Sequence, residues 1–460
     1  MSRLPRTSLE VSAVEPTLQP ALSAPRLLLW SAPDDERERR RRHALRRYVS
    51  LDGDGDGTPE RLARAAALAA ERRGTGTVRG AVVAATVEDA VRALADPPAA
   101  RAPGGPRPVV LLFPGQGAQQ PAMAAGLYGW EPHFTAALDR VFTELGPEGA
   151  RLRDRWLAGD ADPAMDDAPQ SQPLLFGIGY ALGRMVLDWG ITPAALLGHS
   201  VGELVAATLS GVFTLPDALW VLRDRVAGAA GTGPGGMLAV AASAEDLVPY
   251  LPVGGRVAVA AVNAPRQTLL AGPEPELRAV EARLRADGRT CRRAASHQAF
   301  HSPVMDGVAR LGRPLVAAAR PGPPSWPLYS AYLPGLLDAG RAVDPEFWAR
   351  QIADPVLFWP ALDALLATGG HLLVEAGPGQ GLSAIARLHR TVRTGDSAVA
   401  PLLPARSGTA AADRRALLGA AGRIWTEGHA LGSLGALAGD SGPGPAPGSA
   451  AGAPAPARVG

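Results

Sequence analysis

The stretch LLGHSVGE, residues 196–203, decides the fold of this 460-residue chain. A short apolar run leads into G-x-S-x-G, and residues 204–213, LVAATLSGVF, follow with a helical pattern. A strand, a tight turn permitted by small residues, and a helix describe a nucleophile elbow, which lifts a serine to the edge of a parallel sheet. The helix N-terminus beside that serine favours developing negative charge. The stretch therefore predicts an α/β fold in which Ser200 is a nucleophile.

Other strands of the same sheet are predicted at 109–113 (VVLLF), 194–198 (AALLG) and 371–377 (HLLVEAG). Between the last two, residues 237–295 alternate in the order β-α-β-β-α-β, which is typical of a ferredoxin-like unit. The predicted fold is an α/β-hydrolase-like large domain with a parallel sheet and an inserted ferredoxin-like small domain. A small α/β linker domain, from Arg26 onward, is predicted to precede both.

Changes in composition divide the chain further, and a Pro/Gly-rich stretch separates the first two units. The C-terminal stretch is rich in Pro, Gly and Ala, cannot bury a core and is expected to be disordered. The predicted segments are a loose arm (1–25), the linker-like domain (26–105), the first part of the large domain (106–235), the small domain (236–296), the second part of the large domain (297–430) and the tail (431–460).

Composition excludes several chemistries. All 46 basic residues are arginine, so no lysine can form a Schiff base or a Walker A phosphate contact. The single cysteine, Cys291, excludes internal disulfides and cysteine-cluster metal sites, and it suits a reducing cytoplasm. No metal ligation is expected. A net charge of +2 gives no case for nucleic acid, and no apolar run approaches the about 20 residues of a membrane span.

A serine nucleophile needs a general base within about 2.6–3.2 Å of its Oγ. Of the eight histidines, His199 adjoins Ser200, but its side chain should point the other way and pack. His297 and His301 both lie in the segment that follows the inserted unit, and position alone does not choose between them. The loop FPGQGAQ, residues 113–119, is either a plain strand-to-helix turn or a source of backbone N–H groups for an oxyanion.

Seven motifs carry a family resemblance. FPGQGAQ, SQPLLF, LLGHSVGE, AVNAPRQTLLAGP, QAFHSP, DPEFWARQI and VEAGPGQGL occur in the order found in acyltransferases of the malonyl-CoA:acyl-carrier-protein transacylase family. Residues 107–425 most resemble the acyltransferase domains of modular polyketide synthases, and residues 26–95 resemble the linker domain that precedes them. Because ketosynthase and carrier-protein motifs are missing, a discrete enzyme or an excised segment is expected.

The resemblance implies a role for each matching position. Ser200 would be the nucleophile and His301, the histidine of AFHS, its base, with the imidazole oriented by main-chain carbonyl groups. Backbone N–H groups of Gln116 and Val201 would form the oxyanion hole.

The resemblance also implies substrate contacts. Arg223, in VLRDR, would grip the free carboxylate of a malonyl group, and Asn263 would lie near the thioester arm. Phe300 would fill the space that an α-methyl group needs, which favours malonyl over methylmalonyl. The departures from the family pattern, which leave a larger or unusual acyl group open, are Ala227 for Met, Leu357 for Arg and an added Gln298.

The implied reaction has two half-reactions. An acyl-CoA acylates Ser200, and the phosphopantetheine thiol of an acidic acyl carrier protein then takes the acyl group, with no cofactor bound to this chain. Transfer of an alkylmalonyl or unusual acyl group is one alternative. An editing hydrolase that releases acyl groups from carrier proteins would use the same dyad with water. A non-catalytic docking module is the third interpretation.

Overall fold

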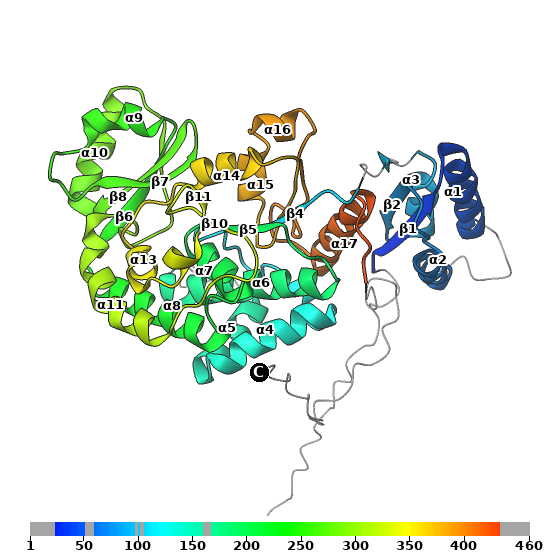
Figure 1. The fold of residues 1–460 in the computed structure, drawn as a ribbon, viewed down its shortest axis with the longest axis horizontal. Helices are drawn as coiled ribbons and strands as arrows, with labels where there is room; N and C mark the ends of the chain where they lie inside the picture. Colours follow the sequence, from blue (N-terminus) through cyan, green and yellow to red (C-terminus); the bar gives the residue numbers. More distant parts are fainter. Residues whose placement is uncertain (1–23, 51–58, 97–99, 102–104, 160–166, 433–460) are drawn as a thin grey trace, which may run out of the picture.

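The structure is a computed structural model that describes residues 24–50, 59–96, 100–101, 105–159 and 167–432. The expected arm over 1–25 and the expected tail over 431–460 lie almost wholly outside the described residues. Figure 1 shows the described chain as a large α/β body, a smaller sheet-and-helix unit at one end of it and the N-terminal unit at the other.

A six-stranded sheet forms the centre of the large body, in the order β11-β10-β5-β4-β12-β13. Its strands pair in parallel except for the edge strand β11, which is antiparallel to β10. The predicted parallel sheet is confirmed, and its three predicted strands lie side by side as β5, β4 and β12. The strands are β4 (Val109–Phe113), β5 (Ala195–Gly198), β10 (Leu328–Ser330), β11 (Gly335–Leu336), β12 (Leu372–Glu375) and β13 (Ala398–Val399).

Helices cover both faces of this sheet, and every side chain of its strand β4 is therefore buried. Leu111 and Leu196 face one apolar core, whereas Val110 and Leu112 face the other. The first core is built with α4 (Pro132–Glu144), α5 (Pro147–Ala158), α6 (Ala168–Asp188), α7 (Val201–Leu209), α8 (Leu215–Ala230), α11 (Asp306–Ala318), α13 (Pro345–Arg350) and α17 (Ala410–Thr426). The second is built with α14 (Phe358–Leu366) and α15 (Gly381–Ala386).

The inserted unit carries a four-stranded antiparallel sheet of order β7-β8-β6-β9. Its elements follow one another as strand, helix, strand, strand, helix, strand, which is the predicted order, although the first helix is a single short turn. They are β6 (Gly235–Val240), α9 (Ala244–Leu247), β7 (Ala258–Ala264), β8 (Gln267–Pro273), α10 (Glu274–Ala286) and β9 (Cys291–Arg293).

The N-terminal unit contains a three-stranded sheet whose strand β1 is buried on both faces. Leu28 and Trp30 of β1 pack into the unit's own core, while Leu27 and Leu29 pack into the core of the large body. Helix α17 supplies the contact and lies between the two units in Figure 1. The elements are β1 (Arg26–Ala32), α1 (Asp35–Ser50), α2 (Pro59–Glu71), β2 (Val78–Ala84), α3 (Val87–Ala93) and β3 (Ala100–Arg101).

Arg79 fastens this unit to α17. Its guanidinium lies 4.3 Å from the centroid of the Trp425 ring, and its Nη1 donates to the carbonyl oxygens of Trp425 at 3.0 Å and His429 at 2.9 Å. The guanidinium of Arg79 on β2 therefore joins the N-terminal unit, through three contacts, to the end of α17 and the residues that follow it. Among the described helices, none is long and apolar enough to cross a membrane.

Arg79→Ala is expected to lower the free energy of unfolding by about 2 kcal/mol, because a cation–π contact and two charge-assisted hydrogen bonds are lost together. Urea unfolding followed by circular dichroism measures this. Arg40→Ala is the control, since Arg40 pairs with Glu36 at an exposed site worth less than about 0.5 kcal/mol. Equal losses for the two variants would contradict the fastening role.

Candidate active site

The turn between β5 and α7 has the geometry of a nucleophile elbow. Ser200 has φ 53° and ψ −120°, a strained conformation for a residue with a side chain. A Cβ on Gly198 would lie 2.1 Å from the backbone nitrogen of Glu203, and one on Gly202 would lie 2.1 Å from the carbonyl oxygen of Phe113. Both glycines of G-x-S-x-G are therefore required by backbone packing, and the turn holds the Ser200 side chain at the carboxyl end of β5.

His301 is the histidine that reaches Ser200. Its Nε2 lies 2.8 Å from Ser200 Oγ, and its Nδ1 lies 3.0 Å from the carbonyl oxygen of Asp354. A carbonyl can only accept, so Nδ1 carries the proton and Nε2 accepts from the serine hydroxyl. His297, the other open choice, is 81% exposed at its side chain and lies 3.8 Å from Asp167. The geometry thus pairs Ser200 with His301.

Main-chain carbonyl groups orient both the ring and the backbone of His301. His301 has φ 58°, is 6% exposed, and its backbone N–H donates to the carbonyl of Ile352 at 2.8 Å. Burial lowers the pKa of His301 to about 4, and the neighbouring His199 and, to a smaller extent, the positive charge of Arg225 act in the same direction. Backbone hydrogen bonding to Asp354 opposes this shift. The imidazole is consequently neutral near pH 7 and available to accept a proton.

The loop after β4 lies against the elbow. A Cβ on Gly115 would come within 3.1 Å of Ser200 Cβ, so the two turns leave no space for a side chain there. The next residue, Gln116, accepts a hydrogen bond at its Oε1 from Gln172 Nε2 at 2.9 Å, which anchors the loop to α6. Val201 is the first residue of α7, where a backbone N–H has no acceptor within its own helix. The two predicted oxyanion donors thus flank the serine.

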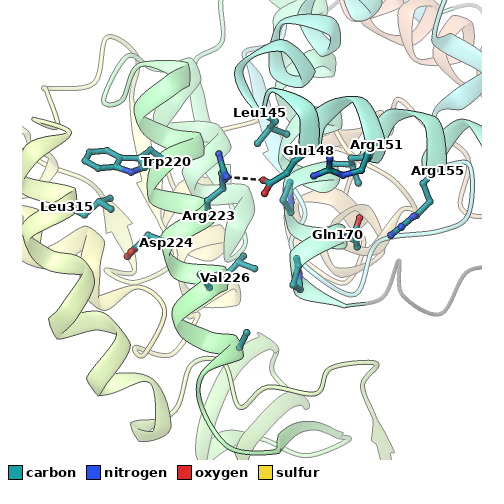
Figure 2. A pocket seen from close by; sticks show the side chains of 15 residues that line it. Leu145, Glu148, Arg151, Arg155, Gln170, Trp220, Arg223, Asp224, Val226 and Leu315 are labelled. Atoms are coloured by element: carbon teal, nitrogen blue, oxygen red, sulfur yellow. Dashed lines mark ion pairs between the residues drawn. The ribbon is translucent and has the colours of Figure 1, made fainter.

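Arg223 does not reach this site, so the expectation that it contacts the acyl group is wrong. Its guanidinium pairs with Glu148 of α5 at 2.9 Å, and its side chain is 49% exposed (Figure 2). Residues two apart on a helix point about 200° away from each other. The other arginine of VLRDR, Arg225, therefore faces the opposite way, toward the catalytic dyad.

Arg225 has the surroundings expected of a carboxylate-binding residue. Its Nη2 donates to the carbonyl of Trp348, and its charge acts on Glu203, Tyr332 and His301. Its Nε is buried and has no hydrogen-bond partner among the described residues. A buried donor without a partner costs about 1–3 kcal/mol, so this guanidinium has unused capacity for an anion. With the arginine reassigned, the Met position of R-x-x-x-M falls on the buried Ala229 rather than on Ala227.

Asn263 and Phe300 both border the dyad. Asn263, on β7, is 8% exposed, and its Oδ1 lies 2.8 Å from Nε2 of His199. His199 also packs on Phe358 at 5.7 Å between ring centroids, so the expected packing role is joined by a polar one. The ring of Phe300 is buried and lies 6.4 Å from that of His301.

Sequence reasoning missed two residues of the site. Tyr332, in the turn after β10, lies with its ring centroid 6.1 Å from that of His301, and burial raises the pKa of its hydroxyl. Glu203 is fully buried and accepts from Ser330 Oγ at 2.6 Å, the N–H of Ala331 at 2.8 Å and Gln351 Nε2 at 3.0 Å. Glu203 belongs to the motif HSVGE, but its hydrogen-bond donors belong to segments that are distant in the sequence.

The dyad, the flanking N–H groups and the nearby guanidinium can perform nucleophilic acyl chemistry on a substrate that bears an anion. Within the described residues, no cluster of three or more His, Cys, Asp or Glu side chains is placed to hold a metal ion.

Comparison with known proteins agrees with this chemistry. The acyl transferase domain family model matches residues 110–427. The chain is 38% identical over 293 residues to a component of the phenolphthiocerol/phthiocerol polyketide synthase of Mycobacterium tuberculosis, covering 62% of this chain and 20% of that protein. It is 33% identical over 348 residues to the spectinabilin polyketide synthase system protein NorB of Streptomyces orinoci, covering 74% and 15%. The chain therefore spans a fifth or less of these relatives.

Two solved structures resemble the fold. The acyl transferase domain of SpnD, in complex with 2-(pent-4-yn-1-yl)malonyl, superposes with a TM-score of 0.76 at 30% identity, covering 90% of this chain and 97% of that one. A malonyl-CoA:acyl carrier protein transacylase from Xanthomonas oryzae gives a TM-score of 0.58 at 25% identity, covering 65% and 95%. The first likeness includes the N-terminal part of the described chain.

The low pKa of His301 has a measurable consequence. Sulfonylation of Ser200 by phenylmethanesulfonyl fluoride, followed by intact mass, is expected to be independent of pH from about 8 to 5 and to slow as the pH falls through about 4. His301→Ala should slow labelling about 10²-fold, whereas His297→Ala should leave it unchanged.

A midpoint near the ordinary histidine pKa of about 6.5 would contradict this assignment. Because the folded-state pKa lies below the unfolded one, the stability contributed by neutral His301 is also lost as the pH falls between these values. Circular dichroism at each pH separates unfolding from protonation of the base.

Proposed function

We propose that this chain, which belongs to the acyl transferase domain family, moves a malonyl-type acyl group from coenzyme A to the phosphopantetheine thiol of an acyl carrier protein in polyketide biosynthesis. The observation that carries the proposal is the hydrogen-bonded pair of Ser200 and His301, together with the buried guanidinium of Arg225, whose charge acts on His301. A neutral base, a strained nucleophile and a fixed cation suit a thioester that carries a free carboxylate.

In the first half-reaction, Ser200 Oγ attacks the thioester carbonyl while His301 Nε2 takes the hydroxyl proton. The oxyanion that forms is bound by the backbone N–H groups of Gln116 and Val201. The carbon–sulfur bond then breaks, and the thiolate of coenzyme A leaves with the proton from His301. Asp354 keeps Nδ1 protonated throughout, because its carbonyl can only accept.

In the second half-reaction, the phosphopantetheine thiol gives its proton to His301 and attacks the acyl-Ser200 ester. The ester bond to Oγ breaks, and the serine takes the proton back. The acidic carrier protein and the acyl-CoA are the substrates, and no cofactor is bound by the chain itself.

Arg225 takes the carboxylate-binding role in place of Arg223. A guanidinium can grip a carboxylate with two parallel hydrogen bonds, and the buried Nε supplies a donor that has no partner in the described structure. Phe300 limits the space beside His301, which favours an unsubstituted malonyl group. At position 229 the family pattern has Met. The smaller Ala229 leaves more space for an α-substituent, so Phe300 and Ala229 together determine which substituent fits.

Incubation with malonyl-CoA is expected to increase the intact mass of the protein by one malonyl group, attached to Ser200 and not formed in Ser200→Ala. Addition of a holo acyl carrier protein should then move the group onto the carrier thiol. The absence of an adduct with malonyl-, methylmalonyl- and ethylmalonyl-CoA would refute acyl transfer. Release of free acid faster than transfer to the carrier would identify an editing hydrolase instead.

Arg225→Gln is expected to lower the ratio of malonyl to acetyl loading of Ser200 about 10²-fold, because the carboxylate loses a buried charged partner. Arg223→Gln, two residues away on the same helix, is the matched control and should leave the ratio unchanged. The ratio does not depend on how much of the variant is folded. A drop caused by Arg223→Gln and not by Arg225→Gln would reverse the assignment.

A further inference from the structure

A groove of about 720 Å³ separates α5 from α8 on the surface of the large body (Figure 2). Arg223 and Glu148 form an ion pair across it at 2.9 Å, with both side chains about half exposed to solvent. The floor comes from the start of α6, where Pro169, Gln170 and Pro173 line the groove. The groove is distinct from the Ser200 site, because Arg223 and Arg225 point to opposite sides of α8.

The lining of the groove combines positive charge with apolar surface. The charged residues that line the groove are Arg151, Arg155 and Arg223 with the acids Glu148 and Asp224, so the lining has a net charge of +1. Arg151 and Arg155 stand one turn apart on α5, and both are exposed. On the α8 side, Trp220 is 48% exposed and lines the groove together with Leu315 of α11. Exposed tryptophan and arginine are the residue types enriched at the energetic centres of protein interfaces.

The groove is connected to the catalytic machinery through α6. Gln170 lines the groove, and one half-turn further on Gln172 hydrogen-bonds to Gln116 in the oxyanion loop. Asp167, just before α6, lies 3.8 Å from His297 in the segment that leads to the base. A partner seated in the groove would therefore sit next to the segments that form the Ser200 site.

We propose that the groove between α5 and α8 docks an amphipathic helix of the acyl carrier protein, with acidic side chains against Arg151 and Arg155 and apolar ones against Trp220 and Leu315. This inference rests on the proposed function, which supplies the carrier as second substrate. The Glu148–Arg223 pair, exposed and screened, can open to admit an acidic group. Charge complementarity of this kind steers association and fixes orientation.

A second basic surface has no apolar side chains in its lining. It lies on α1 and is lined by Arg39, Arg40, His43, Arg46 and Arg47 with Glu36 and Ser50. Without apolar side chains it resembles a hydrated helix face, and it belongs to the N-terminal unit. It therefore supplies charge-matched control variants.

The test compares three reactions: loading of Ser200 by malonyl-CoA, transfer to a holo acyl carrier protein, and transfer to free pantetheine, which has the same thiol without the protein. The double variant Arg151→Glu/Arg155→Glu is expected to raise the KM for the carrier about tenfold and to leave the other two reactions within about twofold of wild type. Trp220→Ala should act in the same direction, and Arg46→Glu/Arg47→Glu should change nothing.

Each other outcome overturns the docking site. An unchanged KM for the carrier in both groove variants would exclude it, and an effect confined to the α1 variant would move docking to that helix. Slower loading by malonyl-CoA in the groove variants would assign the groove to coenzyme A. Failure of the wild-type protein to load Ser200 at all would instead refute the proposed function, so the two failures are distinguishable.

Discussion

The carboxyl group of Glu203, fully buried one turn into the nucleophile helix, holds together three segments that are distant in sequence. It accepts from Ser330 and Ala331 at the end of β10 and from Gln351 just after α13. The segment that begins at Gln351 supplies the carbonyls that bind His301. The hydrogen bonds of Glu203 therefore link the helix that bears Ser200 to the segment that positions His301. Burial raises the pKa of Glu203 to about 8, while its donors and Arg225 favour the charged form.

The same arrangement explains a base without an acidic partner. A carboxylate next to Nδ1 would raise the pKa of the imidazole by charge attraction, whereas the neutral carbonyl of Asp354 orients the ring and raises its pKa by hydrogen bonding alone. Burial then dominates and lowers the pKa of His301 to about 4. The dyad is thus kept in the reactive, neutral form without the third residue of a Ser-His-Asp triad. The cost is that the imidazolium formed during attack is less stabilised than it would be beside a carboxylate.

The elbow and the central strands could be predicted from the sequence, because they depend on residues that are close together in the chain. The glycines at 198 and 202 are needed where backbone meets backbone, so G-x-S-x-G indicated the elbow and Ser200, and the apolar runs indicated the central strands. His301 required the family resemblance, because nothing near it in sequence separates it from His297. Tyr332 was not predictable, since the turn after β10 comes near His301 only through the pairing of β10 with β5. The family resemblance pointed to Arg223, but VLRDR contains two arginines, and the motif alone does not show which of them faces His301.

Helix α8 bears two arginines that have different surroundings. On α8, the charge of Arg225 acts on the dyad, and its buried Nε has no hydrogen-bond partner among the residues that the structure describes, while Arg223 and Trp220 line the groove on the other side. Both cations are arginine because the chain contains no lysine, and the planar guanidinium keeps its charge in the buried position, where burial lowers its pKa. A two-residue step on a 3.6-residue helix thus separates the proposed acyl-binding charge from a surface charge. In the proposed roles, substrate selection and partner docking can change independently along the same helix.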